Sequence, residues 1–293
     1  MTSGFPLLSG VSALICRYDV FVLDLWGVLH DGVTAYDGAL DALTRLKAAG
    51  KRTVLLSNAP RRADALVAAM AEMGLPRDAY DAIHSSGEAT RQRLERRSGP
   101  AFASLGQRLY FIGQDKDRDV FAGLPVTETA DPAKADFVLV CGPRDFAHPL
   151  AAYEAEIARL AATRPPMICA NPDRGVIRAG RNVVCAGNIA DLYAARGGAV
   201  AFVGKPDAAV YDEALALLGN PEKSRVAGIG DGLATDIPGC RAAGIDAVLC
   251  TGGVNAAALA TAHGEMPDPA AAHALAAAAG ETPVAAIPAF VWG

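Results

Sequence analysis

The chain has 293 residues, of which 52% are hydrophobic, and a net charge of −5. This length suits two domains that each bury a core. No apolar run approaches the ~20 residues that span a bilayer. The acidic balance gives no electrostatic basis for binding nucleic acid or an anionic membrane. Six cysteines without Cys-x-x-Cys spacing, and an amino-terminal segment without a basic region followed by an apolar stretch, predict a cytoplasmic protein with reduced thiols.

The part of the chain up to about residue 82 alternates between strand and helix patterns. These fall at 18–23 (strand), 38–49 (helix), 53–56 (strand) and 62–73 (helix). Asp24 follows the first strand, where a carboxylate is a nucleophile, a metal ligand or a turn or capping residue. Ser57 and Asn58 follow the second strand. Ser57 either caps the next helix or, beside helix-terminal amides, binds a phosphate.

The middle of the chain continues the alternation. Its expected elements are a short strand and a capped helix within 82–98, strands over 109–113 and 136–140, a helix over 150–163 and a strand over 166–170. Arg144 and Arg174 lie in turns after two of these strands. They either recognise a second anionic group of a ligand or are ordinary surface arginines.

The last part of the chain is expected to hold a helix from 186, a strand ending near 203, a helix over 207–218, a strand over 226–230 followed by a helix from 236, an Ala-rich helix over 269–280 and a strand within 283–292. Lys205 lies between a glycine and a proline just after an apolar run, which positions its side chain. Asp231 ends a strand and Asp236 opens a helix. Together with Asp24 they form an oxygen-rich group suited to Mg²⁺.

The order of these residues resembles the four motifs of the haloacid dehalogenase-like (HAD) hydrolase superfamily. The segment 230–237, Gly-Asp-Gly-Leu-Ala-Thr-Asp-Ile, is the most specific match, and 204–206, Gly-Lys-Pro, is the usual context of the family's lysine. The long stretch between Asn58 and Lys205 resembles class IIA, the NagD or nitrophenyl-phosphatase type. In that class a cap domain is inserted between the second and third motifs.

The resemblance implies an α/β fold with a doubly wound, parallel-sheet (Rossmann-like) core and a smaller inserted α/β cap domain. The core is expected over 1–82 and 186–293 and the cap over 83–185. Because caps of this class supply the leaving-group pocket, the segments 141–146 and 171–174 are expected near the substrate. Caps of this class also commonly mediate dimers, so a homodimer is a further expectation from the resemblance.

The resemblance also implies a Mg²⁺-dependent hydrolase that acts on a small-molecule phosphoester. Asp24 would be the nucleophile that forms an aspartyl-phosphate, and Lys205 would keep Asp24 ionised and contact a phosphate oxygen. Ser57 and Asn58 would hold further phosphate oxygens. The expected metal ligands are the carboxylates of Asp24 and Asp231 and the backbone carbonyl of Trp26, with Asp236 acting through water or by orienting the site.

Trp26 departs from the family pattern, because phosphatases of this superfamily carry a second Asp there as general acid. An indole N–H has no proton to exchange near neutral pH, and general acid–base help contributes roughly 10²–10⁴-fold. We therefore expect slow hydrolysis of substrates with poor leaving groups, unless His30 or Asp31 replaces the missing acid.

Two alternatives to an efficient phosphatase follow from the same position. One is a metal- and phosphoester-binding protein with vestigial turnover. The other is a dehalogenase, because the true haloacid dehalogenases also carry an aromatic residue two positions after the nucleophile. The intact acidic pair Asp231 and Asp236 argues against dehalogenation, which needs no metal.

Overall fold

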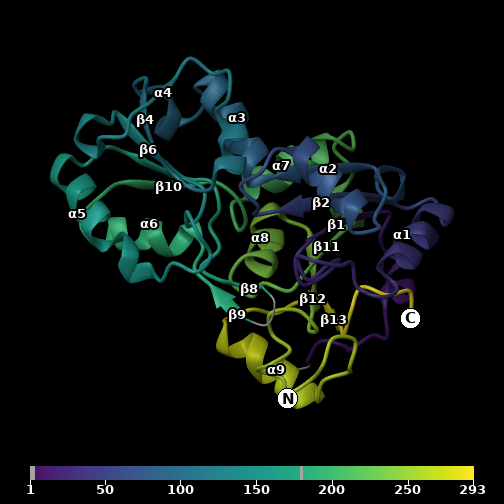
Figure 1. The fold of residues 1–293 in the computed structure, drawn as a ribbon. Helices are drawn as coiled ribbons and strands as arrows, with labels where there is room; N and C mark the ends of the chain where they lie inside the picture. Colours follow the sequence, from purple (N-terminus) through teal and green to yellow (C-terminus); the bar gives the residue numbers. More distant parts are fainter. Residues whose placement is uncertain (1–3, 179–180) are drawn as a thin grey trace. The chain divides into compact units, whose positions relative to one another are not determined.

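The computed structural model describes residues 4–178 and 181–293. The chain forms two compact units, drawn in Figure 1 with colours that follow the sequence. The first unit comprises the residues up to Ser57 together with Leu66–His84 and Lys205–Gly293, and the second comprises Asn58–Ala65 and Ser85–Gly204. Within the described ranges, no helix is long and apolar enough to cross a membrane.

A six-stranded sheet, in the order β13-β12-β11-β1-β2-β3, forms the centre of the first unit. Its strands are β1 (Val20–Leu23), β2 (Arg52–Ser57), β3 (Ala82–Ser85), β11 (Val226–Gly230), β12 (Asp246–Cys250) and β13 (Ala285–Ile287). The α-helices around it are α1 (Ala39–Ala48), α2 (Ala63–Glu72), α7 (Ala208–Ala216), α8 (Asp236–Ala243) and α9 (Pro269–Ala278). Short 3₁₀ turns occur at Val11–Leu14, Arg77–Ala79 and Lys223–Arg225.

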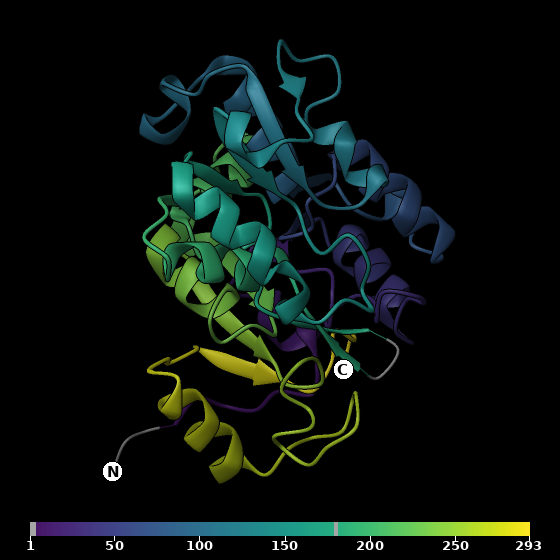
Figure 2. The same ribbon diagram turned by 60° about the vertical axis from the view of Figure 1, so that its left-hand side comes forward.

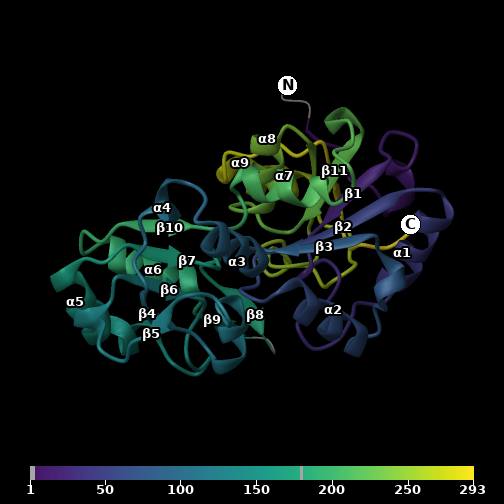
Figure 3. The same cartoon turned by 90° about the horizontal axis from the view of Figure 1, so that it is seen from above.

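The helices cover both faces of this sheet. The chain crosses from β1 to β2 through α1, and from β11 to β12 in the opposite direction along the sheet through α8. Because such crossovers between parallel strands are right-handed, α1 and α8 belong on opposite faces. Figure 3 shows α7 and α8 on one side of the strands and α2 on the other. The predicted doubly wound α/β fold is thus confirmed.

The two central strands explain why functional side chains gather at one edge. Strands β1 and β11 are buried along their whole length, as expected for the continuous apolar runs of a parallel sheet. Leu23 at the end of β1 pairs with Leu55 of β2 and with Ile229 of β11. The residues that follow these three strands therefore emerge at the same carboxyl edge. Strand β1 is also where the connections diverge to left and right, the usual ligand site of such sheets.

The predicted Ala-rich helix and terminal strand are α9 and β13, which follow each other at the yellow end of the chain in Figure 2. Helix α9 begins after Asp268, whose side chain accepts the backbone N–H of Ala271 at 2.9 Å and so caps the helix. Strand β13 pairs in parallel with β12 and forms one edge of the sheet.

The second unit has its own parallel sheet of five strands, in the order β10-β7-β6-β4-β5. These strands are β4 (Arg108–Ile112), β5 (Thr127–Glu128), β6 (Phe137–Val140), β7 (Met167–Cys169) and β10 (Val200–Phe202), and an antiparallel pair is formed by β8 (Val176–Arg178) and β9 (Arg181–Val183). The helices are α3 (Ser86–Arg96), α4 (Pro100–Ala103), α5 (Glu154–Thr163) and α6 (Ala186–Ala194), with 3₁₀ turns at Asp115–Val120, Pro132–Lys134 and Leu150–Tyr153.

The end of the second unit differs from the boundary expected at 186. Helix α6 packs with α5 on the five-stranded sheet, and its Ile189 and Tyr193 belong to the same buried cluster as Ile157 of α5. Strand β10 then pairs with β7, with Val200 opposite Met167. Burial of the apolar face of α6 and edge pairing of β10 therefore keep 186–204 with the second sheet, and the chain enters the first unit again at Lys205.

All six cysteines are free thiols, and five of them are buried. Burial raises the pKa of the Cys169 and Cys185 thiols to about 12, which keeps both groups protonated at neutral pH.

Candidate functional site

The candidate site lies at the carboxyl edge of the six-stranded sheet. Asp24 directly follows β1, Asp231 directly follows β11, and Asp236 is the first residue of α8. One carboxylate oxygen from each of the three lies within 4.8 Å of the others. All three residues are buried, with at most 9% of their surface exposed. The structure therefore brings together the three aspartates that the sequence placed at strand and helix ends.

Lys205 joins two of these aspartates. Its Nζ donates to Asp24 Oδ1 at 2.6 Å and to Asp236 Oδ1 at 2.7 Å. A third hydrogen bond, of 3.1 Å, goes to the backbone carbonyl of Leu56. Only 3% of Lys205 is exposed, so the ammonium group has a fixed place beside Asp24. The last strand before Lys205 is β10, which belongs to the five-stranded sheet, so Lys205 is not at a strand end of the sheet that carries Asp24.

Both oxygens of Asp236 are engaged by protein donors. Oδ1 accepts from Lys205, and Oδ2 accepts the backbone N–H of Gly232 at 3.0 Å. The backbone carbonyl of Asp236 in turn accepts from the Tyr211 hydroxyl at 3.1 Å. This arrangement favours an orienting role for Asp236 over direct metal ligation.

Asp231 is held from a different direction. Its Oδ2 accepts the backbone N–H of Val254 at 2.7 Å, and its backbone carbonyl accepts from the side-chain amide of Asn255 at 2.5 Å. Both donors lie in the loop that follows β12. The sequence analysis did not single out this loop, whose only visible signal is the glycine pair at 252–253.

The electrostatics of the site reflect burial of several charges in one place. Burial, and then the charge of Asp236, raise the pKa of Asp24 to about 7 against the opposing effect of Lys205. Burial and the charge of Asp24 also raise the pKa of Asp231. Burial by itself lowers the pKa of Lys205, but the charges of Asp236 and Asp24 outweigh it and raise the pKa, so the ammonium stays protonated.

The donor set fits a divalent cation that prefers oxygen ligands. Three buried carboxylates share the one ammonium group that bonds to two of them. When all three carboxylates are ionised, two negative charges are left to balance, and an uncompensated buried charge costs several kcal/mol. Mg²⁺ commonly uses one or two carboxylates together with water and substrate phosphate. Asp24 and Asp231 are the carboxylates best placed to hold it, because both oxygens of Asp236 already accept hydrogen bonds.

The Trp26 side chain packs within its own loop. A Cβ built at Gly32 would lie 2.3 Å from the Trp26 ring, and Gly32 has a φ of +90°. The ring also meets His30 edge to face, with centroids 5.6 Å apart. The Trp26 side chain therefore contributes to packing of the loop after β1.

The two nearby candidates for a replacement acid both have structural contacts. Nδ1 of His30 accepts the backbone N–H of Gly32 at 2.9 Å, and burial lowers the pKa of His30 to about 4. His30 is thus neutral at physiological pH and is a poor proton donor. Asp31 Oδ1 accepts the backbone N–H groups of Val33 and Thr34, both at 2.8 Å, which stabilises the turn. The structure favours neither residue as the missing general acid.

Ser57 ends β2 in the first unit and is 7% exposed. It lies next to Leu56, whose carbonyl accepts from Lys205, so it belongs to the same edge of the sheet as Asp24. Asn58 belongs to the second unit, where its side-chain amide donates to Asp173 Oδ1 at 2.8 Å.

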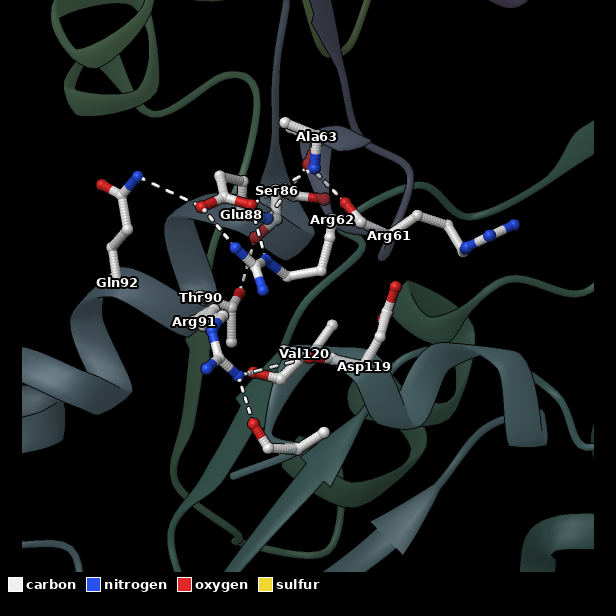
Figure 4. Close-up of polar contacts among 12 residues, drawn as sticks. Arg61, Arg62, Ala63, Ser86, Glu88, Thr90, Arg91, Gln92, Asp119 and Val120 are labelled. Carbon is white, nitrogen blue, oxygen red and sulfur yellow. Dashed lines mark hydrogen bonds and ion pairs between the residues drawn. The ribbon is translucent and has the colours of Figure 1, made fainter. Parts of the chain in front are cut away.

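The segment that follows Asn58 is fastened to the start of α3. Ser86 Oγ donates to the carbonyl of Asn58 at 2.7 Å, and Arg62 pairs with Glu88 at 2.7 Å. Figure 4 shows this network around Glu88, which also accepts the backbone N–H of Ala63. These contacts explain why 58–65 folds with the second unit.

Arg144 and Arg174 are both neutralised within the second unit. The two terminal nitrogens of Arg144 reach Glu156, each at 2.7 Å. Arg174 contacts both oxygens of Asp191, at 2.7 and 3.0 Å. Bidentate pairs of this kind satisfy the guanidinium, so the structure favours a structural role for both arginines over recognition of an anionic ligand.

Comparison with known proteins agrees with this geometry. The profile described as haloacid dehalogenase-like hydrolase matches residues 21–127, and one described as HAD-hydrolase-like matches residues 202–278. A crystal structure of a haloacid dehalogenase-like hydrolase from Brucella suis 1330 is 33% identical, with a TM-score of 0.81, over 96% of this chain and 99% of that one.

Two phosphatases are more distant. The 4-nitrophenylphosphatase of Thermotoga maritima has a TM-score of 0.69 and 24% identity over 94% of this chain and 96% of its own. The D-glycerol 3-phosphate phosphatase of Mycobacterium tuberculosis is 27% identical over 247 residues, which are 82% of this chain and 65% of that protein. The chain thus spans slightly under two thirds of the length of this curated relative. A structure of the glycerol phosphate phosphatase with magnesium is 21% identical, with a TM-score of 0.65, over 89% of this chain and 78% of that one.

Proposed function

Because this chain belongs to the haloacid dehalogenase-like hydrolase family, we propose that it is a Mg²⁺-dependent phosphatase that hydrolyses a small phosphorylated metabolite through an aspartyl-phosphate on Asp24. The observation that carries the proposal is the buried contact of Asp24 with Lys205, beside Asp231 and Asp236, at the carboxyl edge of the sheet. The likeness to nitrophenyl phosphatases agrees with the class IIA type that the motifs resemble.

The residues of the site have distinct roles in this proposal. The Asp24 carboxylate attacks phosphorus, so that a new O–P bond forms while the bond to the leaving oxygen breaks. Water then attacks the same phosphorus and releases inorganic phosphate and the free carboxylate. Lys205 holds Asp24 in its ionised form and offers positive charge to a phosphate oxygen, and Ser57 binds another oxygen. When bound by Asp24 and Asp231, Mg²⁺ would offset the repulsion between the carboxylate and the phosphate dianion.

Trp26 determines which phosphate esters we expect the protein to hydrolyse fastest. Trp26 cannot donate a proton to the leaving oxygen, and it cannot act as a base for the attacking water. Substrates whose leaving group is stable as an anion should therefore react fastest. For alkyl esters the missing help corresponds to a loss of roughly 10²–10⁴-fold.

The proposed substrate class is a small phosphate monoester. The names of the similar proteins give glycerol 3-phosphate and nitrophenyl phosphate as examples for those proteins. For this chain they define the first compounds to test.

The test is steady-state hydrolysis of p-nitrophenyl phosphate by the purified protein, before and after removal of metal with a chelator. We expect turnover that is lost in the chelator and restored by added Mg²⁺. Turnover that is unaffected by metal removal would contradict the metal requirement. Binding of Mg²⁺ without turnover would favour a binding protein with vestigial activity.

A further inference from the structure

The loop after β12 holds Asp231 by two hydrogen bonds on different sides of the residue. The backbone N–H of Val254 donates to Oδ2 at 2.7 Å, and the Asn255 side-chain amide donates to the backbone carbonyl at 2.5 Å. The first bond fixes the carboxylate, and the second fixes the main chain that carries it. A carboxylate held at both points has little freedom to rotate.

Two glycines complete this arrangement by leaving space for the same oxygen. A Cβ built at Gly27 would lie 1.9 Å from Asp231 Oδ2, and one at Gly253 would lie 2.0 Å from it. Oδ2 therefore sits in a slot that only glycine permits on either side. Oδ2 is enclosed by Gly27 and Gly253 and accepts the amide of Val254, which leaves Oδ1 as the oxygen available to a cation.

We propose that Asn255 is a positioning residue for the metal site: together with the Val254 amide, it presents Asp231 as a ligand through one oxygen. This inference rests on the proposed function, because it concerns the Mg²⁺ that the function requires. Asn255 itself contacts the main chain of a ligand residue and not the reacting atoms. Outer contacts of this kind typically change metal affinity or activity by about 10–100-fold when they are removed.

A purely structural role makes a different prediction. If Asn255 only stabilises its loop, its loss should lower the stability of the metal-free protein and leave the affinity for Mg²⁺ unchanged. Thr261 provides a matched control, because its hydroxyl donates to the carbonyl of Ala256 within the same loop, and this hydrogen bond does not involve Asp231.

The experiment measures binding of Mg²⁺ alone to the full-length, metal-free protein by titration calorimetry. The variants are Asn255→Leu, which is also branched at Cγ but has no donor, the smaller Asn255→Ala, and Thr261→Val as the control. Melting temperatures of the metal-free proteins report folding. We expect the dissociation constant to rise at least about tenfold in both Asn255 variants and to stay within twofold in Thr261→Val.

Unchanged affinity in folded Asn255 variants would overturn the inference while leaving the proposed function intact. Absence of Mg²⁺ binding by the wild-type protein would instead contradict the proposed function. Gly253→Ala gives a second measurement if the Asn255 variants do not fold, because its Cβ would displace the Asp231 carboxylate directly. Normal Mg²⁺ affinity in folded Gly253→Ala would also contradict the positioning scheme.

Discussion

At the scale of single residues, Trp26 is the position where the residue type that would help catalysis differs from the residue type that packs the loop. Trp26 follows the proposed nucleophile by two residues, where an acid would assist the leaving group, yet its ring covers Gly32 and meets His30. The surrounding loop packs around this aromatic side chain. A substitution that restores an acid must therefore also remove this packing.

Replacement of Trp26 by Asp tests the consequence for catalysis. We expect kcat/KM for glycerol 3-phosphate to rise in Trp26→Asp by a factor of up to about 10², and to rise much less for p-nitrophenyl phosphate, whose leaving group needs no proton. Trp26→Asn separates the effects, since it loses the same packing without gaining an acid. An equal change for both substrates, or the same change in Trp26→Asn, would contradict the assignment of Trp26 as the missing acid position.

Much of the site could be foreseen from residue types and their places at strand ends. Asp24 and Asp231 were recognisable because each follows a predicted strand, Asp236 because it opens the next helix, and Lys205 because it stands between glycine and proline. The contacts of Val254 and Asn255 could not be foreseen. A backbone amide and an asparagine in a loop have no distinctive pattern, and only the folded chain brings them to Asp231.

At the scale of elements, apolar runs predicted most of the strands and helices, and the misses have physical causes. Strand β5 has two residues, both exposed, so no apolar run marks it. The β8–β9 pair is antiparallel with three residues in each strand, and such short pairs give little periodicity. The sheet to which β10 belongs depends on its pairing with β7, a long-range contact that local sequence does not encode.

The buried His30, in the loop between β1 and α1, should make the free energy of unfolding depend on pH. His30 is 4% exposed, and its pKa is lowered from 6.5 to about 4 by burial. Between these values the unfolded chain binds a proton that the folded state does not, so stability falls as the pH falls from about 6.5 to 4. We expect His30 to contribute about 3 kcal/mol to this loss.

Urea unfolding in the presence of a chelator measures this contribution. The wild-type protein should lose more free energy of unfolding between pH 6.5 and 4 than His30→Asn, and the difference should vanish above pH 7. The titration of the aspartates is common to both proteins and cancels in the comparison. Parallel pH profiles would show that His30 is not held neutral in the folded state.

At the scale of the whole molecule, alternation of strands and helices was enough to predict parallel sheets, and the order of motifs was enough to predict the family and a second, inserted α/β domain. Both are properties that survive errors in individual boundaries. The division of the chain is less local, because 58–65 joins the second unit through contacts with α3, and 186–204 joins it through α6 and β10. Neither set of contacts is visible in the pattern of a single segment.

The central claim is that the buried carboxylate of Asp24, directly after the first strand, is the nucleophile of a site completed by Mg²⁺. The most direct test compares p-nitrophenyl phosphate turnover by the wild-type protein and Asp24→Asn at saturating Mg²⁺, with circular dichroism to confirm that both are folded. We expect magnesium-dependent release of nitrophenol by the wild type and none by the variant. Comparable turnover by folded Asp24→Asn would remove Asp24 from the mechanism and contradict the account.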